Sequence, residues 1–148
     1  MGEVLNMTLE KELLQSIHKA SDMGCEGIKQ VIHHTKDKEL KSALKAQYLE
    51  FQKFRQEAAS MLNAQGVKPK GIGTMAKVSS SMMSKGKLLK DHSSSKIAEM
   101  TIQGNNMGIS QTIKQLHQYH GTNEAATTLA QRVLKAEEEN VSNMQRFL

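Results

Sequence analysis

Hydrophobic and small residues recur three or four positions apart along four long stretches of the chain, with polar residues between them. This spacing is typical of one buried face of an α-helix. In the stretch 96–119 the inward positions would be Ile97, Met100, Thr101, Gly104, Met107, Gly108, Gln111 and Leu116. In a last helix they would be Ala126, Leu129, Ala130, Val133, Ala136, Glu137, Asn140, Val141, Met144 and Phe147. The pattern therefore predicts helices over about 6–34, 35–65, 96–119 and 123–148.

The first and third of these helices resemble each other in sequence. Met23-Gly24 in the first matches Met107-Gly108 in the third, and residues 28–31 (IKQV) match residues 113–116 (IKQL). Each copy runs into a short polar break and then into another helix. The sequence therefore predicts two helical hairpins of common design, over 6–65 and 96–148.

Local signals place the ends of these helices. We expect the first helix to begin near Asn6 or Thr8, and the second near Thr35 or Asp37, which are side chains that cap a helix N-terminus well. Gly66 suits a left-handed C-terminal cap of the second helix. A serine just before residue 96 would cap the third helix.

The connection between the hairpins, residues 66–95, begins as a loop that contains the one proline of the chain, Pro69. Further on, hydrophobic residues return at helical spacing and predict a short extra helix in the connection: Met75, Val78, Met82, Met83 and Leu89. The connection is also rich in lysine, whereas the rest of the chain is close to neutral. Any attraction for anions should therefore belong to this segment.

Composition supports this architecture. The chain has 148 residues, one proline, three phenylalanines, two tyrosines and no tryptophan, which leaves long stretches for helices and little for strands. We expect one all-α domain over residues 1–148. The single cysteine, Cys25, excludes an internal disulfide, and acidic residues stand near the N-terminus where a secretion signal would carry lysines. We therefore expect a cytoplasmic protein.

Four glycines fall inside the predicted helices, at positions 24, 27, 104 and 108. Each should destabilise its helix by about 1 kcal/mol relative to alanine, so some other feature must offset them. Our preferred interpretation is close packing, because Ala20 and Gly24, with Gly27 nearby, would let the first helix touch Gly104 and Gly108 of the third. The alternative is a kink or a turn at Gly104-Asn105-Asn106 that opens a binding pocket.

Polar side chains on the inner faces raise the question of a metal site. Di-iron bundles use a Glu-x-x-His pattern on two of their helices, and no such pattern occurs in the second or fourth helix here. Gln47, Glu99, Glu137 and Asn140 could still form a polar pocket in the core, which leaves an atypical carboxylate metal site as an alternative. We expect no catalytic residues and no cofactor.

Histidines lie near two helix ends, at His33 and His34 and at His117 and His120. A bundle that ran simply up and down would gather them at one end, where they could bind zinc. A long crossover between the hairpins would separate them. Cationic or hydrogen-bonding side chains suit helix C-termini, which is the structural interpretation of these histidines.

Lys77, Lys85, Lys87 and Lys90 form a candidate surface for anions or for a protein partner. The methionines beside them would fit a hydrophobic groove of a partner protein, or an anionic membrane surface as a weaker alternative. The absence of arginine and of interleaved aromatic residues from the segment argues against nucleic acid. No small-molecule substrate is evident from the sequence.

The hairpin repeat, the segment IAEMTIQGNNMG at 97–108 and the C-terminal EEENVSNMQRFL at 137–148 resemble small ferritin-like proteins of Gram-positive bacteria. The resemblance covers nearly the whole chain. It implies a ferritin-like four-helix bundle with a pseudo-twofold axis and self-association. It transfers no activity, because metal-binding ferritin-like relatives carry the Glu-x-x-His pattern that is missing here.

Together these observations favour a non-enzymatic helical bundle that acts by association, as a homodimer or with another protein. A metal-binding ferritin-like protein with an atypical carboxylate site is the second hypothesis. An anion-binding module that works through the lysines is the third.

Overall fold

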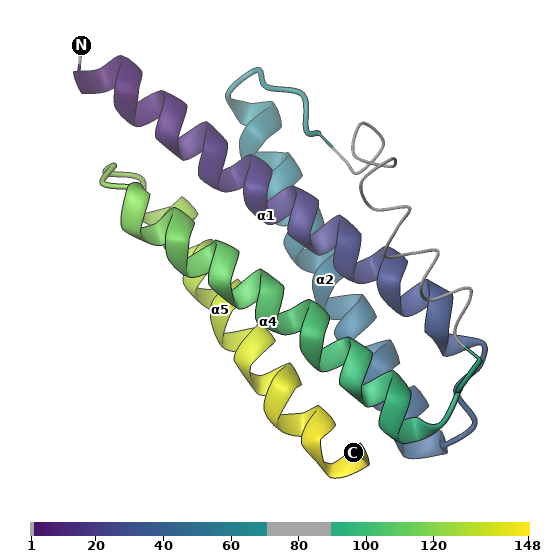
Figure 1. The fold of residues 1–148 in the computed structure, drawn as a ribbon. Coiled ribbons are helices and arrows are strands. Elements are labelled where there is room, and N and C mark those ends of the chain that lie inside the picture. The colour runs from purple at the N-terminus through teal and green to yellow at the C-terminus, as the bar shows by residue number, and fades with distance from the viewer. Residues whose placement is uncertain (1, 71–89) are drawn as a thin grey trace.

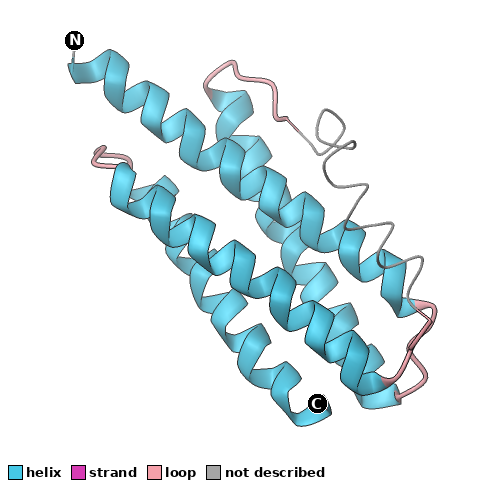
Figure 2. Ribbon diagram, viewed as in Figure 1, coloured by secondary structure: helices cyan, strands magenta, loops and turns pink. Residues whose placement is uncertain are grey.

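The computed structural model describes residues 2–70 and 90–148, with side chains described from Met7 onward. Its helices are α1 (Gly2–Ile32), α2 (Lys38–Ala64), α4 (Ser94–Gln118) and α5 (Glu124–Met144), and a 3-10 turn, η2 (Gln145–Phe147), follows α5. Figure 2 shows helices and loops and no strand in the part of the chain that is described. The prediction of an all-α four-helix bundle is confirmed.

The helices form two antiparallel pairs, α1 with α2 and α4 with α5 (Figure 1). Helices α2 and α4 run in the same direction, so the connection between them spans the length of the bundle. Helices α1 and α4 are therefore antiparallel. At one end of this pair the rings of His34 and His92 stack, with centroids 4.1 Å apart, and at the other Glu10 accepts a hydrogen bond from Asn123.

This arrangement corresponds to the crossover alternative, and it separates the two groups of histidines. His33 and His34 follow the C-terminal end of α1, whereas His117 and His120 lie at the C-terminal end of α4. The ends of antiparallel neighbours point in opposite directions, so the four rings do not gather into one cluster.

Side-chain caps fix three of the helix starts. The Asp37 side chain accepts a hydrogen bond from the Leu40 backbone N–H at 2.9 Å and caps α2. Ser93 caps α4 by accepting from the Lys96 N–H, and Asn123 caps α5 by accepting from the Ala126 N–H, both at 3.2 Å. Gly66, with φ of +72°, ends the α2 region in the left-handed conformation. The predicted ends of α2 and the serine cap of α4 are therefore confirmed. Helix α1 begins at Gly2, ahead of the expected Asn6 or Thr8.

The core lies along the axis of the bundle, where the apolar faces of all four helices meet. Its fully buried large side chains are Leu13, Leu14, Leu40, Leu44, Leu62, Ile97, Leu129, Val133 and Met144. The inner face predicted for the last helix is confirmed from Ala126 to Met144, with Val141 and Phe147 half-buried at its edge.

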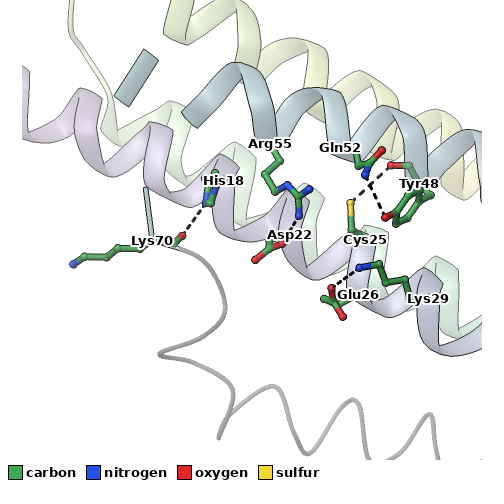
Figure 3. Close-up of polar contacts among 9 residues, drawn as sticks. All are labelled: His18, Asp22, Cys25, Glu26, Lys29, Tyr48, Gln52, Arg55 and Lys70. Atoms are coloured by element: carbon green, nitrogen blue, oxygen red, sulfur yellow. Dashed lines mark hydrogen bonds and ion pairs between the residues drawn. The ribbon is translucent and has the colours of Figure 1, made fainter. Parts of the chain in front are cut away.

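The first residues of the connection are fastened to α1. The Gln15 side chain donates to the Lys68 carbonyl at 3.1 Å and accepts from the Lys70 N–H at 2.9 Å. His18 Nδ1 lies 2.9 Å from the Lys70 carbonyl (Figure 3). The short extra helix predicted from Met75 to Leu89 lies outside the described residues. Within the described residues, no helix is long and apolar enough to cross a membrane.

Candidate functional site

A cavity of about 190 Å³ lies between α1 and α4. Its floor is formed by Gln47 and Phe51 of α2 and Glu137 of α5. Small and flexible side chains of the two outer helices line its walls, among them Ala20, Met23, Gly27, Met100, Gly104, Asn105 and Met107. Its lining is largely hydrophobic, with a few polar groups, which is the usual character of a ligand site.

The four helical glycines all line this cavity, and they differ in what surrounds them. A β-carbon on Gly27 or Gly104 would meet no described atom within 4 Å. A β-carbon on Gly24 would approach the ring of Phe51 to 2.7 Å, and one on Gly108 would overlap the Glu137 carboxyl group. Gly24 and Gly108 therefore make room for side chains from the hairpin partners, α2 and α5.

We expected Ala20, Gly24 and Gly27 of α1 to touch Gly104 and Gly108 of α4. The structure does not show such contact at Gly27 and Gly104, which are both exposed. Both glycines border open space between α1 and α4, and Ala20 lines the same cavity. The alternative interpretation was a kink or a turn at Gly104-Asn105-Asn106 that opens a binding pocket. Gly104 and Asn105 do line the cavity. Helix α4 runs unbroken through these residues, so no turn interrupts it there.

Glu137 is the buried carboxyl group of the site, with 3% of its surface exposed. Thr112 Oγ1 donates a hydrogen bond to its Oε1 at 3.3 Å, and its Oε2 lies where a β-carbon of residue 108 would be. Burial raises the pKa of Glu137 to about 8, with a smaller upward contribution from the charge of Glu138, and the Thr112 hydrogen bond opposes the rise. The group is therefore largely protonated at pH 7.

Gln47 is a second buried polar group of the cavity, 5% exposed. Its Oε1 atom has no hydrogen-bond partner within the described part of the chain. A buried acceptor without a donor costs about 1–3 kcal/mol. Beside it, Asn140 donates to Asn105 Oδ1 at 3.1 Å, and Asn105 donates to the Thr101 carbonyl at 2.9 Å.

The polar pocket predicted from Gln47, Glu99, Glu137 and Asn140 is only partly formed. Gln47 and Glu137 line the cavity, and Asn140 reaches it through Asn105. Glu99 is placed differently, because its side chain is 49% exposed and lies 3.5 Å from the Lys96 ammonium group. Among the residues that are described, no group of three His, Cys, Asp or Glu side chains is placed to hold a metal ion.

The charge that faces the cavity is acidic. Glu26 of α1 and Glu137 of α5 line it, and none of its described lining residues is lysine or arginine. Lys29 pairs with Glu26 at 3.1 Å from outside the lining and is itself half exposed (Figure 3). The cavity of a protein with a net charge of +5 thus presents acceptors and acids.

Cys25 lies outside the cavity lining, where α1 packs against α2 (Figure 3). The side chain is fully buried, its sulfur lies 3.8 Å from the Tyr48 carbonyl, and burial raises the pKa of the thiol. An ion pair between Arg55 and Asp22, at 2.8 Å, holds the same seam. These features make Cys25 a packing residue.

The candidate lysine surface lies mostly beyond the described structure. Lys77, Lys85 and Lys87 fall within 71–89, outside the described residues. Lys90 is described and exposed.

Sequence reasoning did not select Phe51 or Thr112 as site residues, and it mentioned Asn105 only within the alternative turn. Phe51 fits the ordinary pattern of a core aromatic residue, and its ring fills the space over Gly24. Thr112 is one of several threonines whose hydroxyl group could donate a hydrogen bond to a backbone carbonyl of its own helix. The usable signal was Asn105, a polar residue on the buried side of α4 beside a glycine.

Comparison with known proteins supports the fold alone. No model of a protein family matches the chain, and no curated protein matches its sequence. The chain is similar in structure to a solved protein described as a conserved hypothetical protein, rv2844, from Mycobacterium tuberculosis. The TM-score is 0.73 at 12% sequence identity, over 95% of this chain and 98% of that one.

Proposed function

We propose that this protein is a non-enzymatic binding protein that holds a small, largely apolar molecule in the cavity between α1 and α4. The observation that carries the proposal is the largely apolar cavity itself, which is lined by Gln47, a residue whose buried Oε1 atom has no donor among the described residues. A ligand with a hydrogen-bond donor would remove the cost of that unpaired acceptor. The apolar walls would bind the remainder of the molecule.

The size of the cavity limits the ligand. Engineered apolar cavities of about 150 Å³ bind benzene. A cavity of about 190 Å³ therefore accommodates a single ring with a short substituent, or a short branched chain. Met23, Met100 and Met107 line it, and their flexible thioether side chains adapt to ligands of different shape.

Methionine methyl NMR tests the proposal. Benzyl alcohol and benzylamine, which are single rings with a short polar arm, are titrated into protein labelled at the methionine methyl groups. We expect saturable shifts of the Met23, Met100 and Met107 methyl signals, with the Met144 signal in the core unchanged. If neither compound shifts the three lining methyl groups at millimolar concentration, the proposed function is wrong.

A pocket-blocking variant and a matched control locate the site. Gly104→Leu places a side chain into space that is open around residue 104, so we expect it to abolish the shifts without loss of folding. Gln103→Leu adds the same side chain at the neighbouring exposed position, which is not part of the cavity lining, and should bind like the wild type. Equal binding by both variants would place the ligand elsewhere and contradict the proposal.

Association with a second copy or with another protein stays a proposal from the sequence. Its methionine face in the connection lies outside the described residues, and the described surface adds Leu49 of α2 and Met107 of α4, which are 64% and 46% exposed. Light scattering over a wide concentration range tests it, and a strict monomer at high concentration would rule out the homodimer.

Two further proposals concern a relationship to ferritin-like proteins and the binding of anions by the lysine-rich connection. The single long crossover between hairpins is the connectivity used by ferritin-like bundles, which supports a ferritin-like relationship.

Anion binding through the connection predicts salt-sensitive binding to DNA or acidic vesicles that is lost when Lys77, Lys85, Lys87 and Lys90 become glutamine. Binding that survives these substitutions would exclude the anion proposal.

A further inference from the structure

We propose that the ligand of the cavity is an organic cation, a primary ammonium on a single ring or short hydrocarbon, with its ammonium group between Glu137 and Gln47. This inference rests on the proposed function and names the chemical class of its ligand. It follows from three separate properties of the cavity: the hydrogen-bond acceptors of Gln47 and Glu137, the acidic character of its lining, and the aromatic ring in its floor.

The acceptors come first. Gln47 Oε1 has no donor in the described structure, and the single hydrogen bond that reaches Glu137 comes from Thr112 and goes to Oε1. A primary ammonium group has three donors and no acceptor, so it can serve the two side chains together. An alcohol has one donor and can serve one of them.

The sign of the charge is the second property. Glu137 is followed on its own helix by the exposed Glu138 and lines the cavity together with Glu26 of α1, while the described lining residues from α2 and α4 carry no charge. The nearby Lys29 is engaged with Glu26 at 3.1 Å. A carboxylate ligand would enter a site with acids and without a basic partner. Once Glu137 has lost its proton, a cation meets a charge of opposite sign on a buried side chain, where such pairing is strong.

The third property is the floor. Phe51 is 7% exposed, lines the cavity and sits against Gly24, which has no side chain that could hide the ring. An ammonium over an aromatic face is attracted by the negative face of the ring. The hydrocarbon part of the ligand would pack on Met23, Met100 and Met107.

Binding should exchange a proton for the cation. In the free protein the Glu137 carboxyl group keeps its proton to about pH 8 because it is buried. An adjacent ammonium favours the carboxylate, so the carboxyl O–H bond breaks on binding and the proton passes to solvent. The charge of the cavity is then unchanged, since one cation enters and one proton leaves. Affinity should rise with pH until Glu137 is ionised in the free protein, and then level off.

Isothermal titration calorimetry with benzylamine, benzyl alcohol and benzoate tests the inference. We expect benzylamine to bind at least about tenfold more tightly than benzyl alcohol near pH 8, because charge-assisted hydrogen bonds are roughly twice as strong as neutral ones. Benzoate should not bind. The heat of benzylamine binding at pH 7 should differ between two buffers of different ionisation enthalpy, by an amount that reports proton release.

Two variants remove the recognition groups one at a time. Glu137→Gln keeps the shape and the hydrogen bond from Thr112, so we expect benzylamine affinity to fall about tenfold and the buffer dependence to vanish, with benzyl alcohol unaffected. Gln47→Met removes the unpaired acceptor and should weaken benzylamine while leaving the buffer dependence. Glu138→Gln, at an exposed neighbouring carboxyl group, is the matched control and should behave like the wild type.

The outcomes separate this inference from the proposed function. If benzyl alcohol binds as tightly as benzylamine and both are blocked by Gly104→Leu, the cavity is a ligand site and the cation inference is wrong. If benzylamine binding survives Glu137→Gln at full strength, the inference is also wrong. If no compound binds the wild type, the proposed function fails and the inference fails with it.

Discussion

Replacement of the cavity glycines by alanine tests the open space between α1 and α4 directly. In the interior of a helix, alanine is more favourable than glycine by about 0.8–1.0 kcal/mol, provided that the added methyl group meets no obstacle. A β-carbon on Gly104 would meet no described atom within 4 Å, and the same holds for Gly27. We therefore expect Gly104→Ala and Gly27→Ala each to raise the free energy of unfolding by about 1 kcal/mol.

Gly24→Ala is the matched contrast, because it makes the same chemical change at an occupied position of the same helix face. Its β-carbon would come within 2.7 Å of Phe51 Cδ2 and 2.9 Å of Cε2, closer than such atoms pack. Phe51 is buried, so the ring or the helix must shift, and such overpacking costs typically about 1–3 kcal/mol. After the gain in helix propensity, we expect a net loss of roughly 0–2 kcal/mol.

Thermal unfolding and urea unfolding, both followed by circular dichroism, measure these changes in stability. For a chain of this length, 1 kcal/mol corresponds to about 2–4 °C in Tm, so the two classes of variant should separate by several degrees. The slope of the urea dependence should not change, since the surface exposed on unfolding is the same. If Gly104→Ala destabilises the protein as much as Gly24→Ala does, α1 and α4 touch at residue 104 and the cavity does not exist.

Three further predictions concern single side chains. Because the pKa of Glu137 rises from 4.5 to about 8 on folding, the native state holds the extra proton between these values, and stability should fall as pH rises through them. Glu137→Gln should flatten this fall and stabilise the protein by roughly 2–4 kcal/mol near pH 8, measured as urea midpoints against pH, whereas Glu138→Gln should keep the slope. Asp37→Ala removes the cap that accepts from the Leu40 N–H and should cost about 1 kcal/mol; an unchanged midpoint would show that the cap contributes nothing. Cys25 is fully buried with a raised pKa, so a thiol reagent should label it at least about 100-fold more slowly in the native protein than in urea, and rapid native labelling would contradict its packing role.

Glu99 and Glu137 show how much of the candidate site the helical spacing in the sequence can predict. Both were expected in one polar pocket, because both fall on or near the inner face of a helix. A rotation of α4 by a fraction of a turn separates an inward from an outward position, and the pattern does not fix that rotation. In the structure Glu99 pairs with Lys96 at the surface, and Asn105 takes the inward place beside Asn140.

The sequence by itself determined the four helices, a cap of α2 at Thr35 or Asp37, the left-handed end at Gly66 and the buried face of α5. These features depend on residues within one or two turns of each other, so local spacing is enough to predict them. Only the tertiary structure decided that Gly24 is filled by Phe51 while Gly104 stands open. A glycine looks the same in the sequence whether a neighbouring side chain fills the space beside it or a cavity remains. Which of the two occurs depends on the atoms that another helix brings to that position.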